Sequence, residues 1–242
     1  MREMQNTSRY HNLIARTIQI LYPSICPLCE RKSDTLFCAP LCMSCWNTVK
    51  RYTGPSCRIC AMPFASSDSS ICGQCLKMPP PFSEVITYGL FEGALAEAIH
   101  QFKFHGIKRL SGPLSDLLIT IDIPDTDGCV PVPLSIQGLR ERGFNQSLLL
   151  ARNIARQKNL PLFMDVLHKR KETPPQLGLS ASERRSNLNG AFQAIKTVQG
   201  KRLLLVDDVI TTGSTVAECS KQLLKAGARQ VIVLSIARSS MM

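Results

Sequence analysis

The sequence predicts an α/β protein in which helices flank a parallel sheet, with a small cysteine-rich module in front of it. Two strand-to-helix units indicate the sheet. The apolar run Leu203–Leu205 leads through a polar turn into a helix-patterned segment, residues 214–226. The strand pattern at 84–88 is likewise followed by helical spacing of apolar residues over 95–102. Four C-x-x-C pairs, all before residue 76, indicate the module.

The composition is that of a folded protein with one medium domain, or one domain plus a small module. The chain has 242 residues, of which 44% are hydrophobic and 19% charged. Its net charge of +11 favours anionic partners such as nucleic acid, pyrophosphate or an anionic membrane face. A merely basic cytosolic protein fits this charge equally well. No apolar run approaches the length that spans a membrane.

The N-terminal segment, residues 1–22, predicts a short amphipathic helix that ends near Pro23. Its apolar residues recur at helical spacing and basic residues lie between them. Docking on its own domain is the favoured interpretation, and peripheral association with a membrane surface is the alternative. The segment lacks the pattern of a secretory signal, so we expect a cytoplasmic protein.

The cysteine-rich module, residues 23–78, predicts two structural zinc sites. Nine of the eleven cysteines of the chain lie in it. Each C-x-x-C pair can form a knuckle that presents two thiolates to one metal ion, and two knuckles complete a tetrahedral site. Because the gaps between neighbouring knuckles are short, sequential pairing is the simplest. The predicted ligands are Cys26, Cys29, Cys42 and Cys45 for the first zinc, and Cys57, Cys60, Cys72 and Cys75 for the second.

This double zinc ribbon has weaker alternatives. A disulfide framework would require an oxidising compartment, for which the sequence has no targeting signal, and four redox C-x-x-C motifs have no evident use. Cys38 is surplus: it could replace Cys42, but Cys42 has the two-residue spacing to Cys45. Closed four-thiolate sites leave no open position for a substrate, so we expect the module to be a scaffold or an interaction platform.

A proline-rich hinge at 78–82 separates the module from a second domain, residues 79–242. After the first strand and helix, residues 110–121 predict another helix. His100 and His105 lie near the end of the first helix, and solvated or core histidines are favoured over catalytic ones because neither has an evident partner.

A short strand over 129–135 ends in prolines and is followed by a basic segment, Arg140 to Gln146. The arginines, the glycine and the Asn-Gln pair of this segment are suited to binding an oxyanion. A solvated basic turn in which Asn145 caps the next helix is the alternative. Residues 169–192 are rich in charge and proline and predict a mobile loop that closes over a polyphosphate, although a loop without a role would have the same pattern.

The most informative segment is Val206 to Thr215, with the sequence VDDVITTGST. Asp207 and Asp208 can accept hydrogen bonds from a sugar diol or hold a divalent cation. The hydroxyl- and glycine-rich turn after them, Thr211–Thr215, offers backbone N–H groups and the N-terminus of a helix to a phosphate. A ribose 5-phosphate ligand fits both features. An acidic pair before an ordinary turn is the alternative; an ATPase is excluded because the chain has no G-x-x-x-x-G-K-[ST] segment.

This segment resembles the phosphoribosyl pyrophosphate (PRPP) loop of type I phosphoribosyltransferases and matches its pattern without departure. The resemblance implies a type I phosphoribosyltransferase-like domain that binds PRPP with Mg²⁺. Asp207, Asp208 and Arg142 would be its catalytic residues, and Lys169, Arg170, Lys171 or Arg184 would close from the loop. The implied PRPP-binding residues are Asp207, Asp208, Val209, Thr211, Thr212, Gly213, Ser214, Thr215, Val132 and Pro133.

In their order along the chain, the motifs resemble the ComF family of bacterial competence proteins. The motifs are the four knuckles, the Val-Pro-Val-Pro turn, Arg-Gly-Phe-Asn-Gln, the segment 176–192 and the PRPP loop. The resemblance implies a double zinc ribbon fused to the phosphoribosyltransferase-like domain. It also implies a role in natural transformation, on single-stranded DNA that has entered the cytoplasm and alongside the competence helicase.

Two hypotheses follow. The protein is either a DNA-handling factor that needs its PRPP/Mg²⁺ site, or an active phosphoribosyltransferase with an unidentified acceptor. A purely structural zinc adaptor is a third. For DNA handling, the predicted nucleic-acid contacts are basic, with Phe102, Phe104 and Phe144 as stacking candidates of which at least two are expected in the core. The basic residues are Arg140, Arg142, Lys103, Lys169, Arg170 and Lys171.

Overall fold

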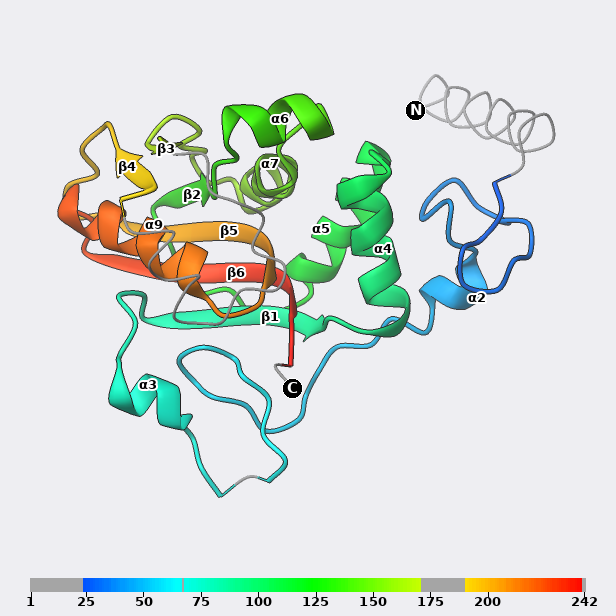
Figure 1. The fold of residues 1–242 in the computed structure, drawn as a ribbon, viewed down its shortest axis with the longest axis horizontal. Helices are drawn as coiled ribbons and strands as arrows, with labels where there is room; N and C mark the ends of the chain where they lie inside the picture. Colours follow the sequence, from blue (N-terminus) through cyan, green and yellow to red (C-terminus); the bar gives the residue numbers. More distant parts are fainter. Residues whose placement is uncertain (1–23, 67, 171–189, 241–242) are drawn as a thin grey trace, which may run out of the picture.

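The computed structural model describes residues 24–66, 68–170 and 190–240. Within them, a four-stranded sheet forms the centre of the molecule, with strand order β1-β6-β5-β2 and every neighbouring pair parallel (Figure 1). Its strands are β1 (Glu84–Leu90), β2 (Gly128–Pro131), β5 (Arg202–Ile210) and β6 (Gln230–Arg238). The parallel sheet flanked by helices that the sequence predicts is therefore confirmed.

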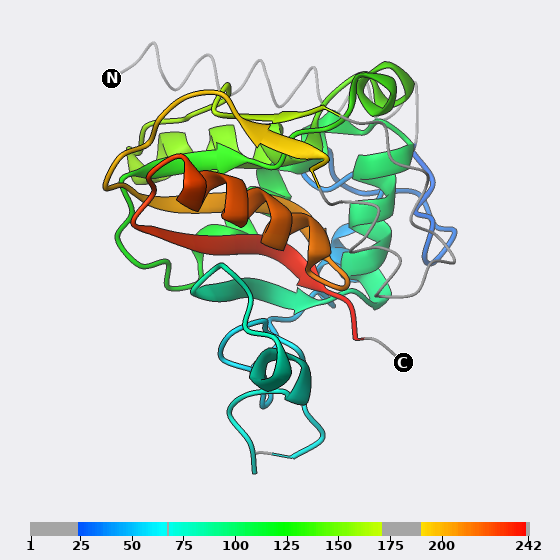
Figure 2. The same cartoon turned by 60° about the vertical axis from the view of Figure 1, so that its left-hand side comes forward.

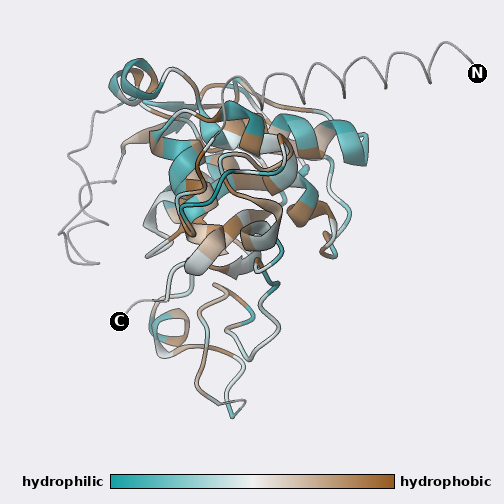
Figure 3. Ribbon diagram, turned by 90° about the vertical axis from the view of Figure 1, so that its right-hand side faces the viewer, coloured by the Kyte–Doolittle hydropathy of each residue, from teal (hydrophilic) through white to brown (hydrophobic). Residues whose placement is uncertain are grey.

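Helices cover both faces of the sheet. One face carries α4 (Gly93–Phe104), α5 (Ser111–Ile119) and α7 (Gln146–Lys158), and the other carries α9 (Ser214–Lys225) (Figure 2). Alternate residues of β5 serve the two faces, because successive side chains of a strand point in opposite directions: Leu204 packs with α5 and α7, and Leu205 with α9. Hydrophilic and hydrophobic stretches alternate along the surrounding helices (Figure 3).

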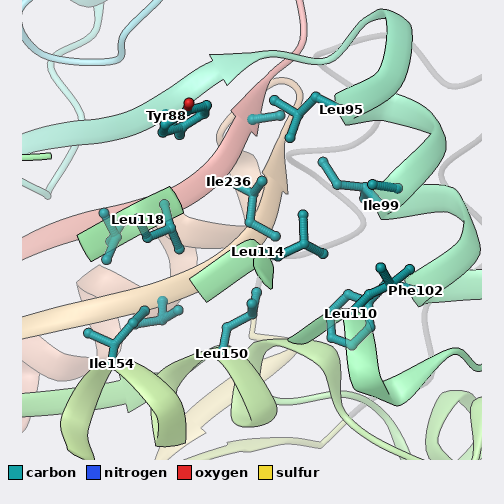
Figure 4. Close-up of a cluster of buried hydrophobic side chains, with 14 of the residues drawn as sticks. Tyr88, Leu95, Ile99, Phe102, Leu110, Leu114, Leu118, Leu150, Ile154 and Ile236 are labelled. Carbon is teal, nitrogen blue, oxygen red and sulfur yellow. The ribbon is translucent and has the colours of Figure 1, made fainter. Parts of the chain in front are cut away.

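We name the two packed clusters after their helices. The α4/α5/α7 core contains Phe102, Leu114 and Ile154, which point inward from their three helices toward the sheet (Figure 4). The α9 core lies on the other face, around Val130, Leu205 and Val233. A two-stranded antiparallel hairpin of β3 (Leu167–Lys169) and β4 (Phe192–Ala194) packs beside α9.

The cysteine-rich module forms two ribbons that join different core clusters, the first of them beside α4. The first ribbon (residues 24–50) contains α2 (Met43–Trp46) and contributes Leu41 and Trp46 to the α4/α5/α7 core. The second ribbon (residues 51–78) contains α3 (Gly73–Lys77), lies beyond β1 in Figures 1 and 2, and contributes Ala61 to the α9 core. The ribbons are thus packed into the body of the protein.

The outer edge of β1 is also covered by this module. Val85 donates its N–H to the carbonyl of Ile59 (2.8 Å), and Tyr52 donates to the carbonyl of Tyr88 (2.9 Å). An open strand edge exposes unpaired backbone groups that invite association with other chains. The second ribbon therefore closes the sheet at β1.

Two segments differ from their predicted form. The basic segment after β2 is partly helical: α6 (Ile136–Arg142) holds both of its arginines, begins where Ser135 accepts a hydrogen bond from the N–H of Gly138, and ends at Gly143 with φ of +72°. The predicted loop 169–192 begins and ends in β3 and β4, because Lys169 pairs with Phe192, whose ring is buried. Residues 171–189 lie outside the described residues, and so does the predicted helix at 1–22.

Among the described residues, the remaining helix is the single turn η1 (Lys108–Leu110) before α5. No helix in the described part of the chain combines the length and the hydrophobicity needed to cross a bilayer.

Candidate functional site

The two acidic residues of the 206–215 segment lie near the end of strand β5. This is the carboxyl edge of the parallel sheet, where ligands of such sheets bind. β5 continues through both residues to Ile210, because its backbone stays paired with β6 as far as Arg238. The strand therefore ends five residues later than the apolar run Leu203–Leu205 alone indicates.

Asp208 is held by protein donors on both of its carboxylate oxygens. Lys103, in the last turn of α4, lies 3.1 Å from Oδ1 and 3.0 Å from Oδ2. Gln146 donates its Nε2 to Oδ2 (3.2 Å), and the backbone N–H of Val209 donates to Oδ1 (2.7 Å). With the side chain buried and both oxygens satisfied, Asp208 is part of the site's internal network.

Asp207 keeps one oxygen for a ligand. Its Oδ1 accepts hydrogen bonds from the hydroxyl of Ser147 and from the N–H of Asp208, both at 3.0 Å. Within the described residues, Oδ2 has no hydrogen-bond donor. Asp207 also lines a small hollow together with the phosphate loop, which we define as residues 211–215. A hydroxyl-bearing ligand in this hollow would meet a carboxylate oxygen that accepts no hydrogen bond from the described residues.

The phosphate loop is ordered by its own hydroxyl groups. Gly213 has φ of +79°, a left-handed conformation that favours glycine, and precedes the first residue of α9. The hydroxyls of Thr212 and Ser214 are hydrogen-bonded (2.9 Å), and Thr212 also accepts from the N–H of Ser214 (3.3 Å). This turn brings the N-terminus of a twelve-residue helix beside Asp207, as the sequence predicts.

Burial and the neighbouring Asp208 raise the pKa of Asp207 to about 7, against the opposing effect of Lys103. A carboxyl whose pKa is higher in the folded than in the unfolded protein holds its proton while the unfolded chain loses it. The free energy of unfolding therefore falls as pH rises from about 4 to 7 on account of this group.

We expect the substitution Asp207→Asn, which keeps an acceptor for Ser147, to remove this pH-dependent cost. The variant should gain about 4 kcal/mol of unfolding free energy at pH 8 and be equal to the wild type near pH 4. Denaturant unfolding at both pH values measures the difference. An equal or lower stability of the variant at pH 8 would contradict the raised pKa.

The basic segment positions the acidic pair. Asn145 caps α7 by accepting the N–H of Leu148 (3.2 Å) and donates its Nδ2 to the carbonyl of Val132 (3.0 Å), which ties the helix to the turn after β2. The next two residues, Gln146 and Ser147, then reach Asp208 and Asp207. The Arg-Gly-Phe-Asn-Gln motif thus supports the acidic pair from the first turn of α7.

The backbone of Val132, in the turn after β2, is hydrogen-bonded within the protein. Val132 is buried, donates its N–H to Val206 (3.0 Å) and accepts from Asn145. Pro133 has no N–H group. As PRPP-binding residues these two remain predictions, and any contribution they make is through the shape of the turn.

The basic residues predicted to contact nucleic acid divide into groups. Lys103 pairs with Asp208, and the Arg142 guanidinium carbon lies 5.3 Å from the centre of the Phe104 ring. Lys169 lies over the ring of Phe192, whereas Arg140 and Arg170 are exposed. Lys171 and Arg184 lie outside the described residues. The structure thus brings Lys103 to the acidic pair and leaves Lys169 with the hairpin.

The cysteines form two clusters. The sulfurs of Cys26, Cys29, Cys42 and Cys45 all lie within 4.8 Å of one another, and so do those of Cys57, Cys60, Cys72 and Cys75. We call these the first and second cysteine clusters. In each, one thiol pair is 3.6 Å apart, close to the separation of about 3.8 Å between sulfurs bound to one tetrahedral zinc at 2.3 Å. The predicted sequential pairing agrees with this geometry.

The surroundings of two of the thiols favour the thiolate that binds a metal ion, whereas burial raises the pKa of Cys45, Cys60 and Cys75. Hydrogen bonding, led by the backbone N–H of Arg31, lowers the pKa of Cys29 to about 6. The pKa of Cys57 is lowered to about 7, because backbone donors of Cys72, Cys60 and Ile59 outweigh its burial. Cys38 belongs to neither cluster; its buried thiol donates to the carbonyl of Leu41, and burial raises its pKa to about 11.

Two family models match the chain: a double zinc ribbon domain over residues 17–76 and a phosphoribosyl transferase domain over residues 145–240. The DNA utilization protein YhgH of Escherichia coli (strain K12) is 35% identical over 225 residues, which cover 90% of this chain and 98% of that protein. Competence protein F of Haemophilus influenzae is 33% identical over 210 residues, covering 82% of this chain and 90% of its own. The chain belongs to the ComF family. Competence protein ComFC of Bacillus subtilis is 28% identical over 200 residues, covering 77% and 79%.

Three residues of this ComF family site had no assigned part in the acidic pair on sequence grounds. On sequence grounds Lys103 is a predicted nucleic-acid contact, Gln146 belongs to the pair predicted to bind an oxyanion, and Ser147 has no predicted role. Lys103 is 105 residues from Asp208 in the chain, so nothing local indicates the pair. The signal that was available is Asn145, whose position as a helix cap places the next two side chains on the first turn of α7.

Proposed function

We propose that this ComF family protein handles single-stranded DNA in the cytoplasm during DNA uptake, and that a PRPP/Mg²⁺ site at Asp207 is needed for that role. The observation that carries the ligand site is the hollow shared by Asp207 and the phosphate loop. It sets an acceptor without a described donor beside a helix N-terminus. A ribose 5-phosphate has the complementary groups, a diol and a dianion.

The ligand would be bound from two sides. The free Oδ2 of Asp207 accepts a ribose hydroxyl, and backbone N–H groups of the phosphate loop bind the 5-phosphate. Mg²⁺ would arrive with the pyrophosphate of PRPP and neutralise its charge. Arg142 and the exposed Arg170 are the proposed cations for the pyrophosphate end. Val209 and the loop residues Thr211, Thr212, Gly213, Ser214 and Thr215 complete the proposed PRPP site.

DNA contact is proposed at the end of α4 beside this site. Phe104 is 60% exposed, with the Arg142 guanidinium 5.3 Å from its ring centre and the His100 ring at 5.1 Å. By contrast, Phe102 and Phe144 are core residues, as expected for two of the three phenylalanines. An exposed ring next to a cation is the arrangement on which single-stranded bases stack. His100 and His105 are exposed at the same end of the helix.

We expect Phe104→Ala to weaken binding of a single-stranded oligonucleotide by about five- to a hundredfold, the loss of one stacked base. Fluorescence anisotropy with a labelled oligo-dT at fixed salt measures it. The matched control is Phe91→Ala, because Phe91 is an exposed phenylalanine before the other end of α4. Equal affinities of the two variants would contradict base stacking on Phe104.

The two arginines of α6, of which Arg142 lies over this ring, give an independent test of DNA binding. Charge reversal at Arg140 and Arg142 should abolish binding and flatten its dependence on salt, since each lost phosphate contact reduces the salt slope by about one. A wild type whose affinity is unaffected by salt would contradict DNA handling by phosphate contacts.

The alternative function is an active phosphoribosyltransferase. There, the bond between ribose C1 and pyrophosphate breaks, an acceptor bonds to C1, and pyrophosphate leaves with the electron pair. The acidic pair and the phosphate loop favour it equally. Release of pyrophosphate from PRPP that depends on a defined acceptor would support this alternative. PRPP binding without such release supports the DNA-handling role, with the competence helicase as a proposed partner.

A further inference from the structure

Arg238, the last residue of β6, is a buried cation. It is 1% exposed, and burial lowers the pKa of its guanidinium against the opposing effect of the thiols of Cys60, Cys72 and Cys75. Burying a guanidinium costs several kcal/mol unless acceptors pair with its N–H donors and a negative charge lies nearby. None of the ion pairs between described residues includes Arg238, and its hydrogen bonds go to main-chain carbonyls.

These carbonyls belong to two separate parts of the molecule. Nε donates to the carbonyl of Cys60 in the second ribbon (3.0 Å). Nη1 donates to the carbonyl of Ile210 (2.9 Å), the last residue of β5, to that of Thr211, the first residue of the phosphate loop, and to that of Ser239 (3.2 Å). One rigid, planar group therefore links a residue of the second cysteine cluster to the backbone that positions the loop.

The ribbon and the loop otherwise face each other across a cavity of about 450 Å³. Cys60 and Cys75 line one side of it, Thr212 to Ser214 the other, and Arg238 also borders it. Packing across this gap is incomplete, so the position of the loop relative to the ribbon depends on bridging groups such as this guanidinium.

The charge of a filled second cluster suits the buried cation. Four thiolates and one Zn²⁺ carry a net charge of about −2, and the thiols of Cys60, Cys72 and Cys75 act on Arg238 as favourable charges. The geometry points to Arg238 as a positioning residue that couples metal binding at the second cysteine cluster to the conformation of the phosphate loop. This inference rests on the proposed function only where it says that the loop binds the phosphate of PRPP.

Hydrogen exchange of the loop amides tests the coupling without any ligand. The chain offers matched variants: Cys72→Ser in the second cluster and Cys42→Ser in the first, each at the same position of its knuckle and neither hydrogen-bonded to Arg238. Both should lose one zinc. We expect exchange of amides 211–215 to accelerate about ten- to a hundredfold in Cys72→Ser, the loss of a charge-assisted hydrogen bond, and less than about twofold in Cys42→Ser.

Arg238→Lys keeps the positive charge but loses the planar guanidinium. It therefore disrupts the hydrogen bonds between ribbon and loop without changing a metal ligand. It should retain two zinc ions per chain while loop exchange rises as in Cys72→Ser. Unchanged loop exchange in Arg238→Lys, or equal acceleration in the two cysteine variants, would overturn the coupling.

Binding of PRPP gives the reciprocal measurement. If the coupling holds, PRPP with Mg²⁺ should raise the affinity of one of the two zinc sites, measured by equilibrium competition with a chelator, since the effect of each site on the other is equal in free energy. A wild type that binds no PRPP would sink the proposed ligand site, whereas the exchange experiment would still decide the coupling.

Discussion

Replacing Asp207 and Asp208 together by asparagine is expected to weaken PRPP binding at least about a hundredfold and to abolish transformation. The free Oδ2 of Asp207 becomes an amide donor, and the buried network around Asp208 loses the charge that holds Lys103 and Gln146. Calorimetric titration of PRPP with Mg²⁺ into wild type and variant measures the loss.

The fold should survive this change, because Asp207 carries a cost in the folded state and Lys103 is partly exposed. Asp122→Asn with Asp125→Asn removes the same charge from exposed positions and should bind as the wild type does. No heat from the wild type would exclude the DNA-handling and transferase hypotheses together. Transformation at wild-type frequency by the variant would instead favour a purely structural zinc adaptor.

Removing zinc is the second change with a large expected effect. The protein should contain two zinc ions per chain by atomic emission, and a chelator should lower its free energy of unfolding by about 5 kcal/mol or more. The loss should extend beyond the ribbons, because Leu41 and Trp46 belong to the α4/α5/α7 core and Ala61 to the α9 core. Thermal melting with and without chelator measures it.

Cys38→Ser provides the control for this experiment. Its thiol is buried in the first ribbon but lies outside both clusters. The variant should keep two zinc ions and melt within a few degrees of the wild type. A zinc content of one in this variant would mean that Cys38 replaces Cys42 as a ligand.

The sequence predicts those parts of the molecule whose pattern is local. β5 and α9 are apparent because an apolar strand and an amphipathic helix have different periods. The knuckles are apparent because thiolate spacing is set by the metal. α6 was missed because it has seven residues and exposes its apolar side chains: Ile136 is 67% exposed and Leu139 is 47% exposed, so it has no buried face.

The unpredicted contacts depend on distant partners. The β3–β4 hairpin pairs three residues with three others more than twenty positions away, which no local pattern indicates. The contacts of Arg238 to Cys60 and of Lys103 to Asp208 join residues 178 and 105 positions apart. In each case the residue type is ordinary in its own segment, and only the strand order of the sheet brings the partners together.

The strand order also has a consequence for how the chain assembles during synthesis. The partner of β1 in the sheet is β6, about 140 residues later in the chain, so this pairing must wait until residues 230–238 have left the ribosome. The contacts of β1 with the second ribbon, from Ile59 to Val85 and from Tyr52 to Tyr88, lie within forty residues and are complete much earlier. The nascent β1 therefore has one protected edge long before the strand that pairs with the other is made.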